Sequence, residues 1–156
     1  MADFRIAVAK TLVHEGGYTD NAADRGGPTN YGITQADFPG VDMRTITAAQ
    51  ATEYYATHYW KPLYSQINDQ DIASKLFDMG VLFGIGTAVK ILQVSMESEI
   101  SLVSDGDFGP ETLADVNQYG NLQQYKTVLI QHAINIVNNN PSQGVFVNGW
   151  INRINF

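Results

Sequence analysis

Residues 121–139 carry the clearest helical period in this chain of 156 residues. Large side chains recur there every three or four positions on one stripe, which consists of Leu122, Tyr125, Val128, Leu129, His132, Ala133, Ile136 and Val137. Such a stripe predicts an amphipathic helix with one face to bury. The sequence "NNNP" ends it, because proline cannot continue a helix. The fold must therefore supply partners for a long helix.

Further segments with helical spacing or helix-end signals supply those partners. Residues 3–15 are expected to form a helix that Asp3 caps. Thr47 and Gln50 have the spacing of a capping box for a second helix, which stops before Pro62. Asn68 or Asp69 can cap the next helix. Other helices are expected over 87–100, after the glycines at 84 and 86, and from Pro110 to about residue 119, and Phe146 and Trp150 of the tail are expected to pack back onto the body.

The composition predicts a globular domain and excludes several classes. Apolar residues make up 44% of the chain and charged residues 16%, and no apolar run is long enough for a membrane span. The formal charge of −7 disfavours nucleic acid as a partner. There is no cysteine, and His14, His58 and His132 lack metal-site spacing, so we expect no metal and no cofactor.

The stretch "HEGGYTDNAADRGGPTNYGIT", residues 14–34, interrupts the helical pattern with five glycines. Glycines permit tight turns, so we expect a glycine-rich loop or short β-hairpin after the first helix. Glu15 stands at the end of that helix, where the helix dipole and apolar neighbours favour a protonated carboxyl. A loop that folds back would place Asp24 and Thr29 opposite Glu15, the arrangement of two carboxyls that glycoside hydrolysis uses. The alternative is a solvated helix end followed by an ordinary turn.

This stretch resembles the motif of glycoside hydrolase family 108, in which Glu-Gly-Gly-Tyr precedes Asp-x-Gly-Gly-x-Thr-x-x-Gly-Ile-Thr. The family contains small muramidases of phages and bacteria that cleave peptidoglycan, often labelled endolysins or secretion activators. Weaker resemblance runs through "YYATHYWKPL" and "LFDMGVLFGIGTAVKILQ" to "SDGDFGPETL" and "FVNGWINR". The resemblance implies that Glu15 is the catalytic acid. The order Glu15, Asp24, Thr29 also resembles the Glu–Asp–Thr set of T-even phage lysozymes, although four residues separate Asp24 from Thr29 here instead of five.

The resemblance further implies a mainly α, lysozyme-like domain in two lobes. Residues 1–90 would form the catalytic half, and residues 91–156 a helical peptidoglycan-binding half packed into the same globule. The implied reaction is hydrolysis of the β-1,4 bond between N-acetylmuramic acid and N-acetylglucosamine. Tyr18, Tyr31 and Trp60 are candidates for stacking on sugar rings, with core packing as the alternative for each.

Two other functions stay open from the sequence. A lytic transglycosylase would cleave the same bond without water, and a non-enzymatic accessory protein would bind the wall or assist export. The expected partner is the glycan strand of bacterial peptidoglycan. We expect a monomer that binds no nucleic acid and does not insert into a membrane. The N-terminal segment has no signal-peptide pattern, so we expect synthesis in the host or bacterial cytoplasm. Action on the periplasmic or extracellular wall would then follow release through a holin or a transporter.

Overall fold

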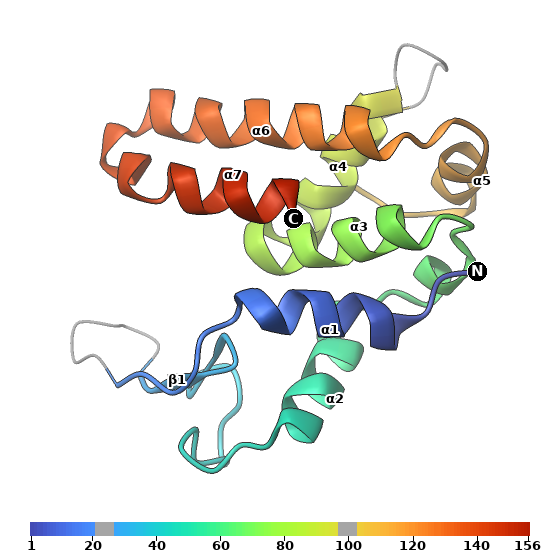
Figure 1. Ribbon diagram of the computed structural model, residues 1–156. Helices are drawn as coiled ribbons and strands as arrows, with labels where there is room; N and C mark the ends of the chain where they lie inside the picture. Colours follow the sequence, from blue (N-terminus) through green and yellow to red (C-terminus); the bar gives the residue numbers. More distant parts are fainter. Residues whose placement is uncertain (21–26, 97–102) are drawn as a thin grey trace.

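The computed structural model describes residues 1–20, 27–96 and 103–156, and α-helices dominate it (Figure 1). A small antiparallel hairpin follows the first helix, so the expected mainly α, lysozyme-like fold class is confirmed. The elements are α1 (Phe4–His14), β1 (Thr29–Asn30), β2 (Ile33–Thr34), α2 (Ala48–His58), the 3₁₀ helix η1 (Pro62–Gln66), α3 (Gln70–Phe83), α4 (Ile85–Met96), α5 (Pro110–Tyr119), α6 (Leu122–Asn139), the 3₁₀ helix η2 (Pro141–Val145) and α7 (Val147–Asn155).

Side chains at the helix ends explain most of these boundaries. The Asp3 carboxylate accepts a hydrogen bond from the Arg5 amide at the start of α1, and Asp69 accepts two amide hydrogen bonds at the start of α3. Thr47 and Gln50 form both bonds of the capping box at α2. Pro110 is the first residue of α5, where a missing amide hydrogen leaves no bond unmade. The helix expected over 87–100 is observed as α4, and its expected end at residues 97–100 lies outside the described residues.

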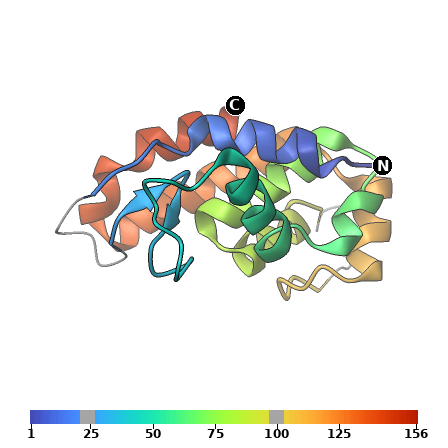
Figure 2. The ribbon, with the colours of Figure 1, turned by 90° about the horizontal axis from the view of Figure 1, so that it is seen from below.

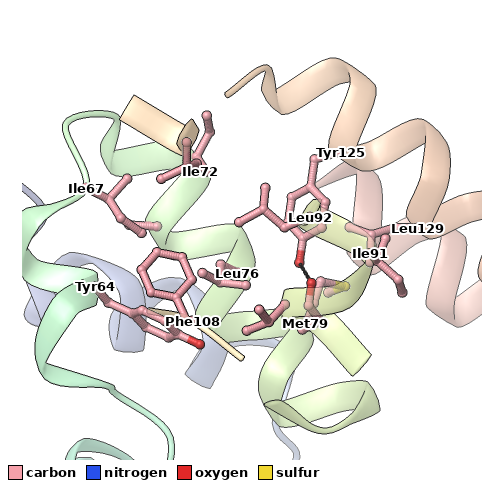
Figure 3. Close-up of a cluster of buried hydrophobic side chains, with 14 of the residues drawn as sticks. Tyr64, Ile67, Ile72, Leu76, Met79, Ile91, Leu92, Phe108, Tyr125 and Leu129 are labelled. Carbon is pink, nitrogen blue, oxygen red and sulfur yellow. Dashed lines mark hydrogen bonds between the residues drawn. The ribbon is translucent and has the colours of Figure 1, made fainter. Parts of the chain in front are cut away.

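Two hydrophobic clusters meet on α3. The larger cluster contains Ile72 and Leu76 of α3, side chains of α4, and Tyr125 and Leu129 of α6. Figure 3 shows this cluster, in which the Tyr125 hydroxyl donates to the Ala88 carbonyl at 3.0 Å. The smaller cluster gathers Phe77 of α3 with side chains of α1, the hairpin and α2. Because α3 turns one side to each cluster, it holds the two groups of helices in a fixed relation.

The smaller cluster lies on the side of α1 where the hairpin and α2 are found. Figure 1 shows α3 on one side of α1, and the hairpin and α2 on the other; Figure 2, seen from below, shows hairpin and α2 next to each other. In the hairpin Thr29 pairs with Thr34 and Asn30 with Ile33. Both residues of its turn, Tyr31 (φ 51°) and Gly32 (φ 73°), have positive φ, as tight hairpin turns require.

Backbone pairing ties this hairpin to the end of α1. Thr19 and Thr29 form an isolated antiparallel bridge, with both N–H···O distances 2.8 Å. The Tyr31 amide also donates to the Gly16 carbonyl at 3.1 Å. The glycine-rich stretch therefore returns the chain to the point where α1 ends.

The last helix, α7, packs against α6 and returns the chain toward α1. Trp150 packs edge-on against Phe83, with 5.9 Å between ring centroids, and Phe146 stacks on Trp150 while 51% of it stays exposed. The predicted division at residues 90 and 91 falls inside α4, and it stays a prediction. None of the helices in the described part of the chain combines the length and the apolar character that crossing a membrane demands.

Candidate active site

Glu15 is the residue directly after α1, and its side chain turns inward. The residue leaves the helix with an extended backbone (φ −80°, ψ 125°) and becomes the C-cap. Its side chain is only 14% exposed, and Nη2 of Arg153 donates to Oε1 at 2.8 Å. The alternative of a solvated helix end does not describe this side chain.

Arg153 is the centre of a small buried group of charges. Its Nη2 also donates to Oδ1 of Asp78 at 2.9 Å, and its Nε donates to the same oxygen at 3.1 Å. Lys75 places Nζ 3.8 Å from Oδ2 of Asp78 and donates to the Arg153 carbonyl at 2.8 Å. Burial disfavours the charged guanidinium, but the hydrogen bonds and charges of Asp78 and Glu15 outweigh it and raise the pKa of Arg153. The guanidinium is therefore a permanent donor to Glu15.

A pocket opens beside this carboxyl. Its volume is about 160 Å³, and it is lined by Glu15, Gly32, Asp37, Tyr54, Tyr55, Tyr59, Val81, Leu82 and Arg153. The lining comes from the end of α1, the hairpin turn, the segment after β2, α2 and the residue after it, α3 and α7. Carboxylates, phenols and a guanidinium together can bind a polyhydroxylated ligand through hydrogen bonds.

Gly32 gives the Glu15 carboxyl its place in this pocket. A Cβ atom on residue 32 would overlap Oε2 of Glu15 and would lie 2.7 Å from its Cδ. The same atom would lie 2.8 Å from the Tyr55 hydroxyl, which donates to the Tyr31 carbonyl at 2.8 Å and fixes the turn. Glycine at position 32 thus allows the Glu15 carboxyl to come close to the turn, and it also permits the positive φ of the turn.

The phenols around the pocket stay protonated. Burial raises the pKa of Tyr55, and the charge of Glu15 raises it further. Burial also raises the pKa of Tyr59, and the charges of Asp37 and Glu15 add to that effect. A phenol that keeps its proton can donate a hydrogen bond to a carboxylate or to a sugar oxygen. The charges of both carboxylates of the pocket, Asp37 and Glu15, therefore act on the Tyr59 phenol and help to keep it protonated.

Asp37 provides the second carboxyl of the pocket among the described residues. It follows β2 and accepts a hydrogen bond from the Thr34 hydroxyl at 2.7 Å. The residue is exposed, in contrast to Glu15. Sequence reasoning did not select it, because no spacing rule connects an aspartate in a short loop to a carboxyl 22 positions earlier.

The other residues chosen from the sequence lie in different surroundings. Asp24 lies outside the described residues. Thr29 belongs to β1, and its hydroxyl donates to the Gly27 carbonyl at 3.3 Å. Tyr18 is exposed beside Asp20, with 3.4 Å between hydroxyl and carboxylate. None of Thr29, Tyr18 and Tyr31 is among the lining residues of the pocket beside Glu15.

Trp60 lies in the aromatic core. Its ring packs against Phe4, Tyr64 and Phe77, with centroids 5.4 to 5.8 Å apart, and its Nε1 donates to the Ser65 hydroxyl at 3.0 Å. Tyr31 contributes its backbone to the turn and packs its ring against the smaller cluster. The aromatic side chains on the pocket are instead those at positions 54, 55 and 59. Residues 55 and 59 are one helical turn apart, a spacing that could have indicated a shared face.

The described residues contain no group of three or more His, Asp or Glu side chains arranged to hold a metal ion. The polar groups that line the pocket beside Glu15 are carboxyl groups, phenols and a guanidinium. These groups can transfer a proton and stabilise developing charge.

Comparison with known proteins identifies the family. The family model of glycosyl hydrolase 108 matches residues 8–84. Over these residues the chain belongs to that family. The matched segment contains the lining residues from Glu15 to Leu82, whereas Arg153 lies beyond it. The chain thus contains a lysozyme-like glycosidase segment, and the role of that segment is related to peptidoglycan.

The fold is also similar to a solved structure, that of SagA from Brucella abortus. The two chains are 25% identical and superpose with a TM-score of 0.74. The match covers 97% of this chain and 89% of the other, so it extends over α5, α6 and α7 as well. None of the curated proteins is similar enough to count as a match.

Proposed function

We propose that this chain is an N-acetylmuramidase that hydrolyses the β-1,4 bond between N-acetylmuramic acid and N-acetylglucosamine in peptidoglycan. The observation that carries the proposal is the Glu15 carboxyl, nearly buried yet lining a pocket within the segment that matches the glycosyl hydrolase family. A wall-binding protein has no need of a carboxyl held in this way.

Glu15 acts as the general acid. Hydrolysis requires a proton on the bridging oxygen as its bond to the anomeric carbon breaks. A guanidinium can only donate hydrogen bonds, so Oε1, which faces Arg153, must be an acceptor. When the carboxyl is protonated, its proton is therefore on Oε2, the oxygen beside Gly32. Arg153 in this way decides which oxygen delivers the proton.

A water molecule completes the reaction. It adds its hydroxyl to the anomeric carbon and gives up its other proton to a base. We propose Asp24 for guiding this water or for stabilising the cationic sugar, and Thr29 for a hydrogen bond to the water. Asp37 is the alternative to Asp24, because it lines the same pocket as Glu15. Separate Asp24→Asn and Asp37→Asn variants decide between them, since the residue in that role causes the larger loss of rate.

The decisive variant is Glu15→Gln, which keeps the shape of the side chain and removes the acid. We expect the release of soluble sugars from purified sacculi to fall by about 10²–10⁴-fold, the usual contribution of a general acid. Glu53→Gln is the matched control, because Glu53 is an exposed residue of α2 outside the pocket. Undiminished activity of Glu15→Gln, with Glu53→Gln also active, would refute the assignment.

Product analysis tests the reaction itself. Mass spectrometry of a digested sacculus should show reducing N-acetylmuramic acid ends. Ends in the 1,6-anhydro form would identify a lytic transglycosylase instead. Binding to sacculi without any release of sugar would identify a non-enzymatic accessory protein.

A further inference from the structure

A second cavity lies between α1, α3 and the start of α6. Its volume is about 220 Å³, and its lining residues are Lys10, His14, Asp71, Ser74, Lys75, Asp78, Leu122, Lys126 and Phe156. It shares no lining residue with the pocket beside Glu15. The two are neighbours nevertheless, because Asp78 lines this cavity and binds Arg153, which lines the other.

Positive charge is concentrated in this cavity. Three of the nine lysines and arginines of an otherwise acidic chain line it. Its two carboxylates already have partners: Asp71 accepts from Lys10 at 2.6 Å, and Asp78 accepts from Arg153. Lys126 donates to the Asn155 carbonyl at 2.9 Å, a neutral acceptor. The ammonium charge of Lys126 thus has no carboxylate partner at hydrogen-bond distance among the contacts of the described residues.

Lys75 is the most enclosed of these cations, with a side chain 8% exposed. Its own hydrogen bond goes to the neutral carbonyl of Arg153, and Asp78 stands 3.8 Å away. Burial lowers the pKa of Lys75 to about 8 against the attraction of Asp78, and the charges of Lys126, Arg153 and Lys10 lower it further. Lys10, Lys75 and Lys126 therefore line one cavity, where the charges of Lys10 and Lys126 act on Lys75.

The imidazole ring of His14 also lines the cavity. Its Nε2 is buried out of reach of solvent and has no hydrogen-bond partner among the described residues. Burial lowers the pKa of this imidazole, and the charges of Arg153 and Lys75 contribute in the same direction against Asp78 and Glu15. With its pKa lowered, this imidazole is neutral near pH 7, so the positive charge of the cavity comes from its lysines.

We propose that this cavity binds a small anionic group, a carboxylate or a phosphate, between Lys75 and Lys126. A bound anion would offset the repulsion among the cations. Leu122 and Phe156 give the cavity an apolar side as well, which suits a carboxylate attached to a short organic chain. The proposal goes beyond the hydrolysis proposed above and does not depend on it.

Calorimetric titration at constant ionic strength tests this site without any activity assay. The probes are sodium phosphate, sodium acetate, the dipeptide D-alanyl-D-alanine and the C-terminal amide of that dipeptide. We expect saturable binding of one anion per chain. Preference for the dipeptide over its amide identifies a peptide carboxylate as the ligand, whereas equal or tighter binding of phosphate identifies a free anion.

Lys126→Met is the test variant, because Lys126 is partly exposed and its loss removes one charged donor. We expect its affinity for the bound probe to fall at least about tenfold, as for loss of a hydrogen bond to a charged group. Lys90→Met is the matched control, since Lys90 is exposed on α4 and does not line the cavity. If Lys126→Met fails to fold, Lys10→Met replaces it. Absence of saturable binding for all four probes, or an equal loss in the control, overturns the proposal.

Discussion

The hairpin turn sets the position of the Glu15 carboxyl, and Gly32→Ala is the smallest change that tests this. A Cβ atom at residue 32 would overlap Oε2 of Glu15 and would stand 2.7 Å from Cδ. Non-bonded carbon atoms prefer separations of about 3.5–4.0 Å, so the carboxyl has to move by about 1 Å. A misplacement of that size costs on the order of 10²-fold in rate. We therefore expect Gly32→Ala to release sugar from sacculi about a hundredfold more slowly than the unchanged chain.

The same substitution also strains the backbone, and a second glycine separates the two effects. Gly32 and Gly40 both have positive φ, at 73° and 88°, where an alanine costs about 1–2 kcal/mol. A Cβ atom on Gly40 meets nothing within 4 Å. The melting temperature of both variants should thus fall by about 2–4 °C for each kcal/mol of unfolding free energy that is lost. Only Gly32→Ala should lose activity as well.

The assay pairs thermal unfolding with the rate of sugar release for the two variants. Gly32→Ala and Gly40→Ala with similar melting temperatures and equal activities would refute the reasoning. The Glu15 carboxyl would then work without the close approach that the turn provides.

Two further predictions concern the buried charges around Arg153. Arg153→Met leaves Asp78 without its main partner, so we expect the free energy of unfolding to fall by about 3–5 kcal/mol in urea titrations. Arg44→Met, which breaks the exposed pair of Arg44 and Asp42, should leave the urea midpoint unchanged, and equal effects would contradict the buried role of Arg153. Because the pKa of Lys75 falls from 10.5 in the unfolded chain to about 8 in the fold, the unfolded chain binds more protons between these values. This group therefore adds stability as pH rises from about 8 to about 10.5, and Lys75→Met should remove that slope relative to the unchanged chain.

Local signals were sufficient for most of the helices. The stripe on residues 121–139 is observed as α6, and the capping box at Thr47 forms as expected. Pro110 begins α5 and the glycines of residues 14–34 surround a hairpin. These features depend on neighbours within a few positions, so the sequence alone contains the information.

The pocket depends on contacts that no local pattern encodes. Arg153 stands 138 positions after Glu15, and their hydrogen bond exists only because α7 returns to the end of α1. The spacing of Tyr55 in α2 and Tyr59 just after it suggests a shared face, but only the fold places both phenols on the pocket of Glu15. Trp60, whose size and polarity suit a sugar ring equally well, is half-buried and packs its ring against Phe77.

The dependence of Glu15 on α7 has a consequence for the order in which the protein matures. Residues 8–84 leave the ribosome well before Arg153 does, so a growing chain contains the complete family segment while Glu15 still lacks the guanidinium that binds it in the fold. The carboxyl takes up its final orientation only when the last helix docks. The geometry described around Glu15 is therefore expected to form only after α7 has been synthesised and has packed against the rest of the fold.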